Sequence, residues 1–239
     1  MERALNLWRH GLGEVPAEIW RRTDLEVLIL ADNGLTAIPP EIGRLRHLRT
    51  LDLGHNALTE VPDEIGGLPA LTDFLYLHDN KLTALPGSVG GLTGLRYLNV
   101  GENSLTALPE SIGDLRGLVE LRAQHNDLRV LPETIGRLSR LRELWLRGNA
   151  LDRLPASVAD LTQLRHLDLR ENALTAIPES LAELPLLRHL DVRSNHLTEL
   201  PDWVAGMPAL EKLDLRWNDV DPPPHLLDTL TRQGCVVLG

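Results

Sequence analysis

The sequence is poor in cysteine, in long apolar runs and in net positive charge. Its one cysteine, Cys235, is typical of a reducing compartment. No stretch is apolar over the length needed to span a membrane, and the N-terminal residues MERALNLWRHGLGE lack the apolar core of a signal peptide. A formal net charge of -10 argues against general nucleic-acid binding, which needs a basic surface. We therefore expect a cytoplasmic protein, although a bacterial effector exported without a cleavable signal would share these features.

What the sequence has in abundance is one repeated unit. Over residues 164–184 the unit reads LRHLDLRENALTAIPESLAEL, and close copies precede and follow it. An asparagine recurs every 23 residues, except for one interval of 24, and His10 takes its place in a degenerate first copy. Ten copies at a fixed period of this length predict a solenoid, in which each unit is stable only when stacked on its neighbours. The asparagines that mark the frame are Asn33, Asn56, Asn80, Asn103, Asn126, Asn149, Asn172, Asn195 and Asn218.

Within each unit, leucines stand five and three residues before the asparagine, as Leu167 and Leu169 do. Their alternation predicts a short strand with one apolar face, which points into the coil. The asparagine follows where the chain turns inward. Its amide can pair backbone groups that a buried turn would otherwise leave without partners, so the stacked asparagines are expected to form a ladder.

A proline stands six residues after every frame position, from Pro16 to Pro224. Proline suits the first position of a short helix, where its missing N–H costs nothing, and an acidic residue such as Glu110 is favourable there. Apolar residues nine and twelve positions past the frame, such as Ile112 and Leu115, would bury the inner side of a helical or 3₁₀ turn. We therefore predict a right-handed coil with parallel strands inside and short helices outside.

This pattern resembles that of leucine-rich-repeat proteins over nearly all of residues 4–239. The 23-residue spacing with L-P-x-x-I-G-x-L is similar to the Ras-group subclass, which includes plant intracellular repeats, animal Ras scaffolds and many bacterial cytoplasmic proteins. The resemblance implies an α/β solenoid in the form of a horseshoe, with a parallel concave sheet and short convex helical segments. Members share a binding architecture rather than a ligand. Extracellular members usually carry cysteine-rich caps, whose absence here again suggests a reducing compartment.

We expect a single domain over residues 1–239, with a degenerate first repeat at 1–22, regular repeats at 23–218 and a C-terminal cap at 219–239. Leu5 and Leu7 would be the buried pair of the first repeat. The one extra residue lies between Leu71 and Leu75. Two interpretations are open: a bulge that re-aims Phe74, or an insertion that the fold simply tolerates.

The cap is predicted to hold a helix from about His225 to Arg232, ended by Gly234. A closing strand would follow, with Val236 and Leu238 in the two buried columns. On this interpretation the cap is complete and the chain is a whole protein. Cys235 is interpreted as a residue at the edge of the cap rather than as a reactive thiol.

Three columns of side chains between the leucines project from the predicted concave sheet. The chain's only phenylalanine and both tyrosines lie there, as Phe74, Tyr76 and Tyr97, and Trp145 lies further along. A leucine-built core does not need aromatic residues at solvent-facing positions, and exposed tyrosine and tryptophan are typical of binding surfaces. The alternative is that cross-strand aromatic pairs only stabilise the sheet.

Further along, the same columns carry files of charge. Four arginines form one file, three aspartates lie beside it, and two histidines and Lys212 flank the other side. Like charges stacked at strand spacing repel, so each file needs its opposite. The pattern indicates either a self-neutralising solvated face or an electrostatic strip that orients a partner of mixed charge.

Chemistry at this face is disfavoured. His166 and His189 beside Asp168 are plausible metal-ligand types, but the neighbouring arginines would oppose a bound cation. No G-x-S-x-G motif or P-loop occurs. We therefore predict no catalytic residues, no metal and no cofactor, and a metal-dependent hydrolase is the least favoured hypothesis.

The favoured hypothesis is a non-enzymatic scaffold that binds a protein or peptide on its concave face and has no nucleic-acid or membrane partner. We expect a monomer, with self-assembly through exposed end strands as the alternative. The predicted partner-binding residues are Phe74, Tyr76, His78, Tyr97, Arg122, Trp145, Arg147, His166, Asp168, Arg170, His189, Asp191, Arg193, Asp214 and Arg216.

Overall fold

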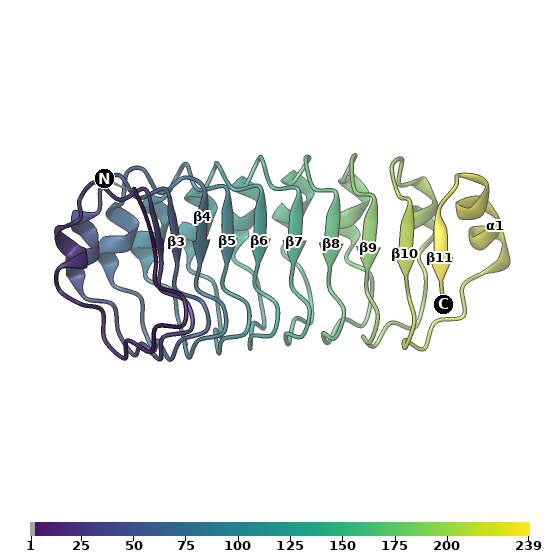
Figure 1. The fold of residues 1–239 in the computed structure, drawn as a ribbon. Helices are drawn as coiled ribbons and strands as arrows, with labels where there is room; N and C mark the ends of the chain where they lie inside the picture. The colour runs from purple at the N-terminus through teal and green to yellow at the C-terminus, as the bar shows by residue number, and fades with distance from the viewer. Residues whose placement is uncertain (1–2) are drawn as a thin grey trace.

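The computed structural model describes residues 3–239, which contain one sheet of eleven parallel strands arranged in chain order (Figure 1). Each strand has three residues, and the middle residue is a leucine in all but the last. The strands are β1 (Ala4–Asn6), β2 (Val27–Ile29), β3 (Thr50–Asp52), β4 (Phe74–Tyr76), β5 (Tyr97–Asn99), β6 (Glu120–Arg122), β7 (Glu143–Trp145), β8 (His166–Asp168), β9 (His189–Asp191), β10 (Lys212–Asp214) and β11 (Val236–Leu238).

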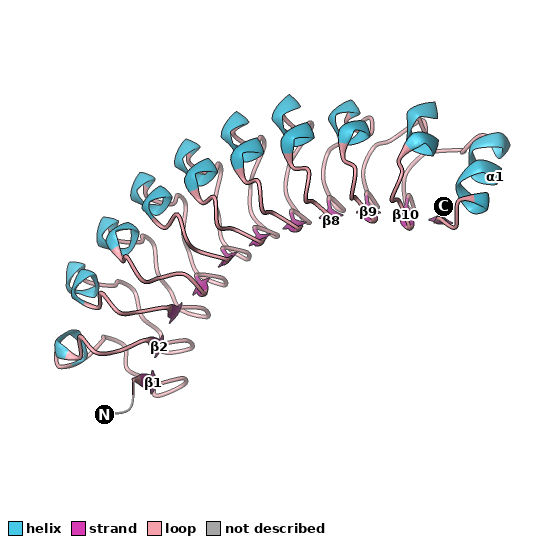
Figure 2. Cartoon of the chain, turned by 90° about the horizontal axis from the view of Figure 1, so that it is seen from above, coloured by secondary structure: helices cyan, strands magenta, loops and turns pink. Residues whose placement is uncertain are grey.

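A short helix follows each of the first ten strands. Viewed from above, the chain forms an arc with the strands on its inner side and the helices on its outer side (Figure 2). The 3₁₀ helices are η1 (Ile19–Arg21), η2 (Pro40–Arg44), η3 (Asp63–Gly67), η4 (Gly87–Gly91), η5 (Glu110–Asp114), η6 (Glu133–Arg137), η7 (Ala156–Asp160), η8 (Glu179–Glu183) and η9 (Asp202–Gly206), and the α-helix is α1 (Pro224–Arg232). This architecture confirms the predicted solenoid with its concave parallel sheet.

The core is a continuous column of leucines between the two layers. The middle strand residue and the residue two positions later, such as Leu167 and Leu169, are fully buried in the regular units. The first unit differs from the prediction because Leu5 and Leu7 are only half-buried. Each inner unit is covered by a neighbour on both sides, whereas β1 pairs with β2 alone. An apolar side chain at this end therefore leaves less surface out of water.

The asparagine ladder is present and joins each unit to the preceding one. The Asn126 amide nitrogen donates to the carbonyl oxygens of Ala123 and Gln124 in its own unit, and to that of Val100 one unit earlier. Its amide oxygen accepts the Leu105 N–H at 2.9 Å. One side chain thus pairs four buried backbone groups across two units, as the sequence predicts.

The residue before each frame position makes the inward turn. Its φ is positive, from 51° at Asp79 to 65° at Gly148, and in nine units the residue is not glycine. The left-handed conformation costs an L-residue roughly 1–2 kcal/mol. The hydrogen bonds of the following asparagine offset that cost.

The prolines lie one position earlier than predicted. In η3 to η9 the proline is the N-cap residue, as Pro109 is with φ -67° and ψ 150°. Its carbonyl oxygen accepts the Ile112 N–H at 2.9 Å and so supplies the first hydrogen bond of the 3₁₀ turn. Proline is compatible with this position because its ring fixes φ and its carbonyl remains free. Only in α1 does the proline of this column, Pro224, take the predicted first helical position.

The extra residue does not re-aim Phe74, so the bulge interpretation is wrong in that respect. Phe74 pairs in regular register with Thr50 on one side and Tyr97 on the other. The insertion is accommodated before β4, where the Thr72 carbonyl oxygen accepts the Arg96 N–H at 2.9 Å. Three-residue strands leave the approach segment free to absorb an added residue without shifting the sheet.

The closing strand is shifted by one residue from the prediction. Val237 pairs with Leu213 and takes the inward column, whereas Val236 pairs with Lys212 and is 56% exposed. The predicted helix and its end at Gly234, with φ 84°, are confirmed. The cap needs one residue more than a regular unit because a nine-residue α-helix replaces the five-residue 3₁₀ turn.

Candidate functional site

All fifteen predicted site residues lie on β4 to β10 or two residues past one of these strands. On each strand, the residues that flank the buried leucine emerge on the concave side. In β4 these are Phe74, which is exposed, and Tyr76, which is half-buried. Because the strands are in register, equivalent side chains stack from one unit to the next.

Three rings form an aromatic cluster at β4 and β5: Phe74, Tyr76 and Tyr97. The Phe74 and Tyr76 rings are stacked, with centroids 5.9 Å apart. Tyr97 lies 5.6 Å from the Phe74 centroid and 5.0 Å from that of Tyr76. Phe74 remains 43% exposed, so the cluster presents an apolar surface to solvent. A solvent-facing aromatic group of this kind is the composition found at binding hot spots.

Arg122 joins this cluster to a second group of rings. Its guanidinium lies 6.0 Å from the Tyr97 ring centroid and 5.0 Å from that of Trp145, within the range of cation–π attraction. Trp145 stacks on His166 with centroids 4.2 Å apart, and His189 meets His166 edge-on at 5.6 Å. We call the continuous surface from β4 to β9 the aromatic belt, and its members are Phe74, Tyr76, Tyr97, Arg122, Trp145, His166 and His189.

The belt is held in a low-charge state. Burial raises the pKa of Tyr97 to about 12, so its hydroxyl is protonated at neutral pH. Burial, and then the nearby His189 ring, lower the pKa of His166. Glu120 accepts a hydrogen bond from the Arg122 Nε at 2.5 Å, which neutralises the belt's arginine. The surface therefore offers flat rings with little unpaired charge.

His78, at the end of the belt near β4, has a neighbour that the sequence did not single out. Its Nε2 lies 3.2 Å from the Nε2 of His55, whose Nδ1 is 2.7 Å from an Asp79 carboxylate oxygen. Gly54 leaves room for the His78 ring, because a Cβ there would stand 2.4 Å from it. His55 lies directly before the frame residue Asn56, in the turn, and so outside the three columns of the concave sheet.

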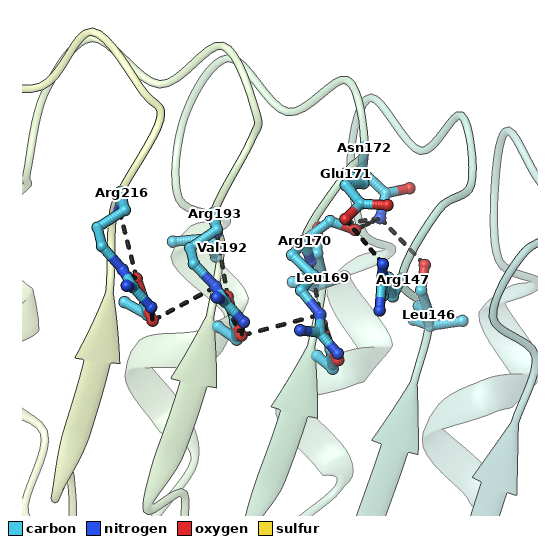
Figure 3. A network of polar contacts seen from close by, with 12 residues as sticks. Leu146, Arg147, Leu169, Arg170, Glu171, Asn172, Val192, Arg193 and Arg216 are labelled. Atoms are coloured by element: carbon cyan, nitrogen blue, oxygen red, sulfur yellow. Dashed lines mark hydrogen bonds and ion pairs between the residues drawn. The ribbon is translucent and has the colours of Figure 1, made fainter. Parts of the chain in front are cut away.

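Beside the C-terminal end of the belt, the predicted files of charge form an Arg/Asp ladder from β8 to β10 (Figure 3). Each arginine pairs with the aspartate two residues before it, at 3.0 Å for Arg170 and Asp168 and at 2.7 Å for Arg216 and Asp214. Arg193 also bridges between strands to Asp214, at 3.3 Å. The arginines and aspartates of the ladder neutralise one another in ion pairs, as expected for a self-neutralising surface. Arg147 is the exception, since it pairs outside the file with Glu171 at 3.1 Å.

The two most buried aspartates of the ladder differ in charge balance. Burial raises the pKa of Asp168, despite its pairing with Arg170. Burial also opposes ionisation of Asp214, but hydrogen bonds from the Arg216 side chain and backbone, with the Arg193 charge, lower its pKa overall. The free energy that Asp214 contributes is therefore present above its unfolded pKa and is lost as the pH falls through the lower folded value. Asp168 has the opposite pH dependence: because its folded pKa is raised, its effect favours the folded state at low pH, and this stabilisation is lost as the pH rises through the folded pKa.

We expect Asp214→Asn to lower the free energy of unfolding by about 1 kcal/mol at pH 7, because two charge-assisted hydrogen bonds weaken. The loss should shrink below about pH 4, where the Asp214 carboxyl of the unfolded chain takes up its proton, and should vanish as the pH falls through the lower pKa of the folded protein. Asp168→Asn is the matched control and should cost less at pH 7 or stabilise the protein. Urea unfolding at several pH values measures both. An Asp214→Asn penalty that does not change with pH would contradict this account.

Sequence reasoning missed a group of arginines just before the strands. A hollow of about 520 Å³, here called the basic hollow, lies beside the starts of β5, β6 and β7. It is lined by Arg96, Gly117, Val119, Arg140, Arg142 and Gln163. A second hollow of about 390 Å³ shares Arg96 and Val119 with it and reaches Phe74 and Tyr97 of the aromatic cluster. The sequence contains a pattern from which a row of arginines could have been predicted here, because Arg142, Arg165 and Arg188 recur at the period of the repeat.

Other chemical features are sparse in the described part of the chain. Residues 3–239 contain no group of three or more His, Cys, Asp or Glu side chains placed to hold a metal ion. Over the same residues, no helix has the length and apolarity needed to cross a membrane. Cys235 is 4% exposed, and burial raises the pKa of its thiol. It lies in the cap between α1 and β11 and packs into the hydrophobic core, not at an edge as the sequence had suggested.

Solved structures similar to this chain are numerous. A leucine-rich-repeat protein of Leptospira interrogans is 31% identical, with a TM-score of 0.75 over 95% of this chain and 70% of its own. The plant peptide hormone receptor RGFR1 in complex with RGF2 is 32% identical, with a TM-score of 0.73. The leucine-rich-repeat ectodomain of the Arabidopsis thaliana receptor kinase GASSHO1/SCHENGEN3, in complex with CASPARIAN STRIP INTEGRITY FACTOR 2, is 28% identical, with a TM-score of 0.80.

The chain covers 41% and 32% of the lengths of these two plant receptors, although they match 94% and 99% of it. No curated protein sequence matches it. A family profile described as leucine rich repeat matches residues 23–82, 139–197 and 169–220, and one described as leucine-rich repeat region matches residues 73–154. These matches do not distinguish the Ras-group subclass, which stays a prediction. The profiles and the 31% identity to the Leptospira protein together show that this chain belongs to the leucine-rich-repeat family.

Proposed function

We propose that this protein is a non-enzymatic scaffold that binds a protein or peptide partner on the aromatic belt of its concave face. The observation that carries the proposal is the continuity of the belt. Its rings run from Phe74 to His189 in two groups, within which neighbouring centroids are 4.2 to 5.9 Å apart. The Arg122 guanidinium lies between the two groups, 6.0 Å from the Tyr97 centroid and 5.0 Å from that of Trp145. Aromatic and arginine side chains supply most of the binding free energy in many interfaces.

The belt is also preorganised, which supports the proposal. Its side chains stand on strands whose backbones are fixed by parallel pairing in a single register. Little conformational entropy is then lost when a partner binds, so more of the contact energy appears as affinity. Two of the similar structures are receptors in complex with a partner, RGF2 in one and CASPARIAN STRIP INTEGRITY FACTOR 2 in the other, which agrees with a binding role for this fold.

In this proposal the Arg/Asp ladder guides orientation and adds little affinity. Its carboxylates are already paired, and Asp214 is 1% exposed between two arginines. A partner gains little by competing for such groups, because their present hydrogen bonds would have to break. We infer that Arg193 and Arg216 hold the end of the sheet rigid and present a fixed pattern of charge to a partner seated on the belt.

The test is a binding comparison between wild type and the double variant Tyr76→Ala with Trp145→Ala. Both proteins serve as baits for crosslinking capture from native lysate, read by mass spectrometry, and the captured partner is then titrated. We expect at least tenfold weaker binding by the double variant, since two central aromatic side chains are removed. Trp8→Ala, which removes a 53% exposed tryptophan from the first unit, is the control and should bind like wild type.

Thermal unfolding must show that the double variant is folded. If the folded double variant binds the partner with unchanged affinity, the assignment to the concave face fails.

Self-assembly through the end strands is a second candidate, favoured by one observation. Val236 of β11 is 56% exposed on a strand that pairs on one side only. Edge strands with exposed apolar residues can pair with another copy. Light scattering across a range of protein concentrations would show a rising mass in that case. A constant monomer mass would remove this candidate.

A further inference from the structure

The column seven residues before each frame position is arranged by charge. In the first four units its members alternate in sign and pair across neighbouring units: Arg3 with Glu26, and Arg49 with Asp73 at 3.1 Å. At the C-terminal end, Arg188 pairs with Glu211 at 3.3 Å. Solvent-facing arginines of this column are therefore neutralised wherever the next unit supplies an acid.

In the central units the next unit supplies no acid in this column. Arg96 is followed in the column by Val119, and Arg142 by Arg165. Among residues 3–239, no carboxylate lies within 4.0 Å of the guanidinium nitrogens of Arg96, Arg142 or the nearby Arg140. The acids on the neighbouring strands β6 and β7 face the belt instead: Glu120 binds Arg122, and Glu143 accepts from the Trp145 indole at 3.3 Å.

These unpaired arginines surround the basic hollow. Arg96, Arg140 and Arg142 come from three successive units and converge on a space of about 520 Å³. Its floor is close-packed backbone, because a Cβ on Gly117 would stand 2.8 Å from the Gly94 carbonyl carbon. Three like charges around one space, in a chain whose formal net charge is -10, are unfavourable unless an anion lies between them.

We propose that the basic hollow binds acidic side chains of a polypeptide partner. This inference rests on the proposed function in one respect: it assigns the acidic segment to the same partner whose apolar part covers the aromatic belt. The geometry supports that link, because the hollow and the space beside Phe74 and Tyr97 share Arg96 and Val119 as walls. Arginine binds carboxylates through paired N–H donors, which suits recognition of aspartate or glutamate.

A polypeptide fits the site better than a nucleic acid does. The three free arginines occupy a single hollow of limited length, whereas a nucleic acid needs basic contacts repeated along its backbone. The surface around the basic hollow is not uniformly basic, since Asp73 and Glu120 line the adjacent hollow of about 390 Å³. The partner we infer therefore has an aromatic or apolar segment followed by a short acidic run.

The test uses fluorescein-labelled hexaglutamate in fluorescence anisotropy at low salt, with a uridine hexanucleotide as the competing probe. Wild type should bind hexaglutamate, and Arg140→Ala with Arg142→Ala should weaken that binding by about tenfold or more. The control is Arg46→Ala with Arg129→Ala, which removes two exposed arginines that have no ion pair in the described chain and changes the net charge equally. This control should bind like wild type.

The Tyr76→Ala, Trp145→Ala variant separates this inference from the proposed function. It should keep its affinity for hexaglutamate, because the belt rings are not part of the hollow. Retained hexaglutamate binding together with unchanged partner binding would refute the concave-face proposal and leave the hollow intact. Absence of hexaglutamate binding to wild type, an equal loss in the two arginine double variants, or equally tight binding of the hexanucleotide would overturn the inference.

Discussion

Replacing Asn126 by alanine is expected to lower the free energy of unfolding by about 4 kcal/mol. The change removes a side chain that pairs the carbonyl oxygens of Val100, Ala123 and Gln124 and the Leu105 N–H. All four groups lie in or beside a turn from which water is excluded, since Asn126 itself is 7% exposed. Each buried group left without a partner costs about 1–3 kcal/mol, and some will find water in the space vacated by the amide.

The matched control is Asn99→Ala. Asn99 is also 7% exposed, but its amide oxygen accepts a bond from the Gly101 N–H at 3.1 Å in its own unit and joins no neighbouring unit. We expect this variant to lose about 1 kcal/mol. Urea denaturation monitored by circular dichroism measures both losses. Similar losses in the two variants would show that the frame asparagines do not hold the units together.

The second large effect is expected from Gly66→Ala in η3, which should destabilise the protein by about 3 kcal/mol. A Cβ at this position would stand 2.0 Å from the Ser88 carbonyl oxygen of η4. A backbone carbonyl cannot swing aside as a side chain can, so two units must separate on the convex side. The same helical position holds glycine from η2 to η6 and alanine from η7 to η9. The backbones of the central convex helices thus approach more closely than a side chain allows.

The next residue provides the control, because a Cβ on Gly67 would meet nothing within 4 Å. Gly67→Ala should leave stability unchanged or raise it by a few tenths of a kcal/mol, since the unfolded chain loses conformational freedom. The measurement is the difference in thermal unfolding between the two adjacent variants. If Gly66→Ala were tolerated as well as Gly67→Ala, close packing of the convex helices would not be what demands glycine.

The sequence period was enough to assign most side chains to a face of the molecule. Leucines with a spacing of two define the buried side of each strand, so Phe74 and Trp145 had to emerge on the concave side. Hydrogen-bond register is not encoded in the spacing. The prolines were therefore placed one position too late along the chain, and Val237 was not recognised as the inward residue of the closing strand.

The basic hollow could not be predicted from the sequence for a different reason. Arg142 and Arg188 occupy the same column, yet Arg188 has an acid 3.3 Å away and Arg142 has none among the described residues. Whether an exposed arginine is neutralised depends on its neighbour in the next unit and on where nearby acids turn. Glu143 could have reached toward this rim, but its carboxylate accepts the Trp145 N–H on the concave side. Which partner a carboxylate binds depends on side-chain conformation, which only the structure shows.

The most direct test of the concave-face proposal is site-specific photo-crosslinking in native lysate. A benzophenone amino acid is placed at Phe74, which is 43% exposed on the belt, or at the exposed Glu133 on the convex helix η6. We predict that one partner is crosslinked from position 74 and not from position 133. A partner crosslinked from position 133 and absent from position 74 would contradict the central claim that the concave aromatic belt is the binding surface.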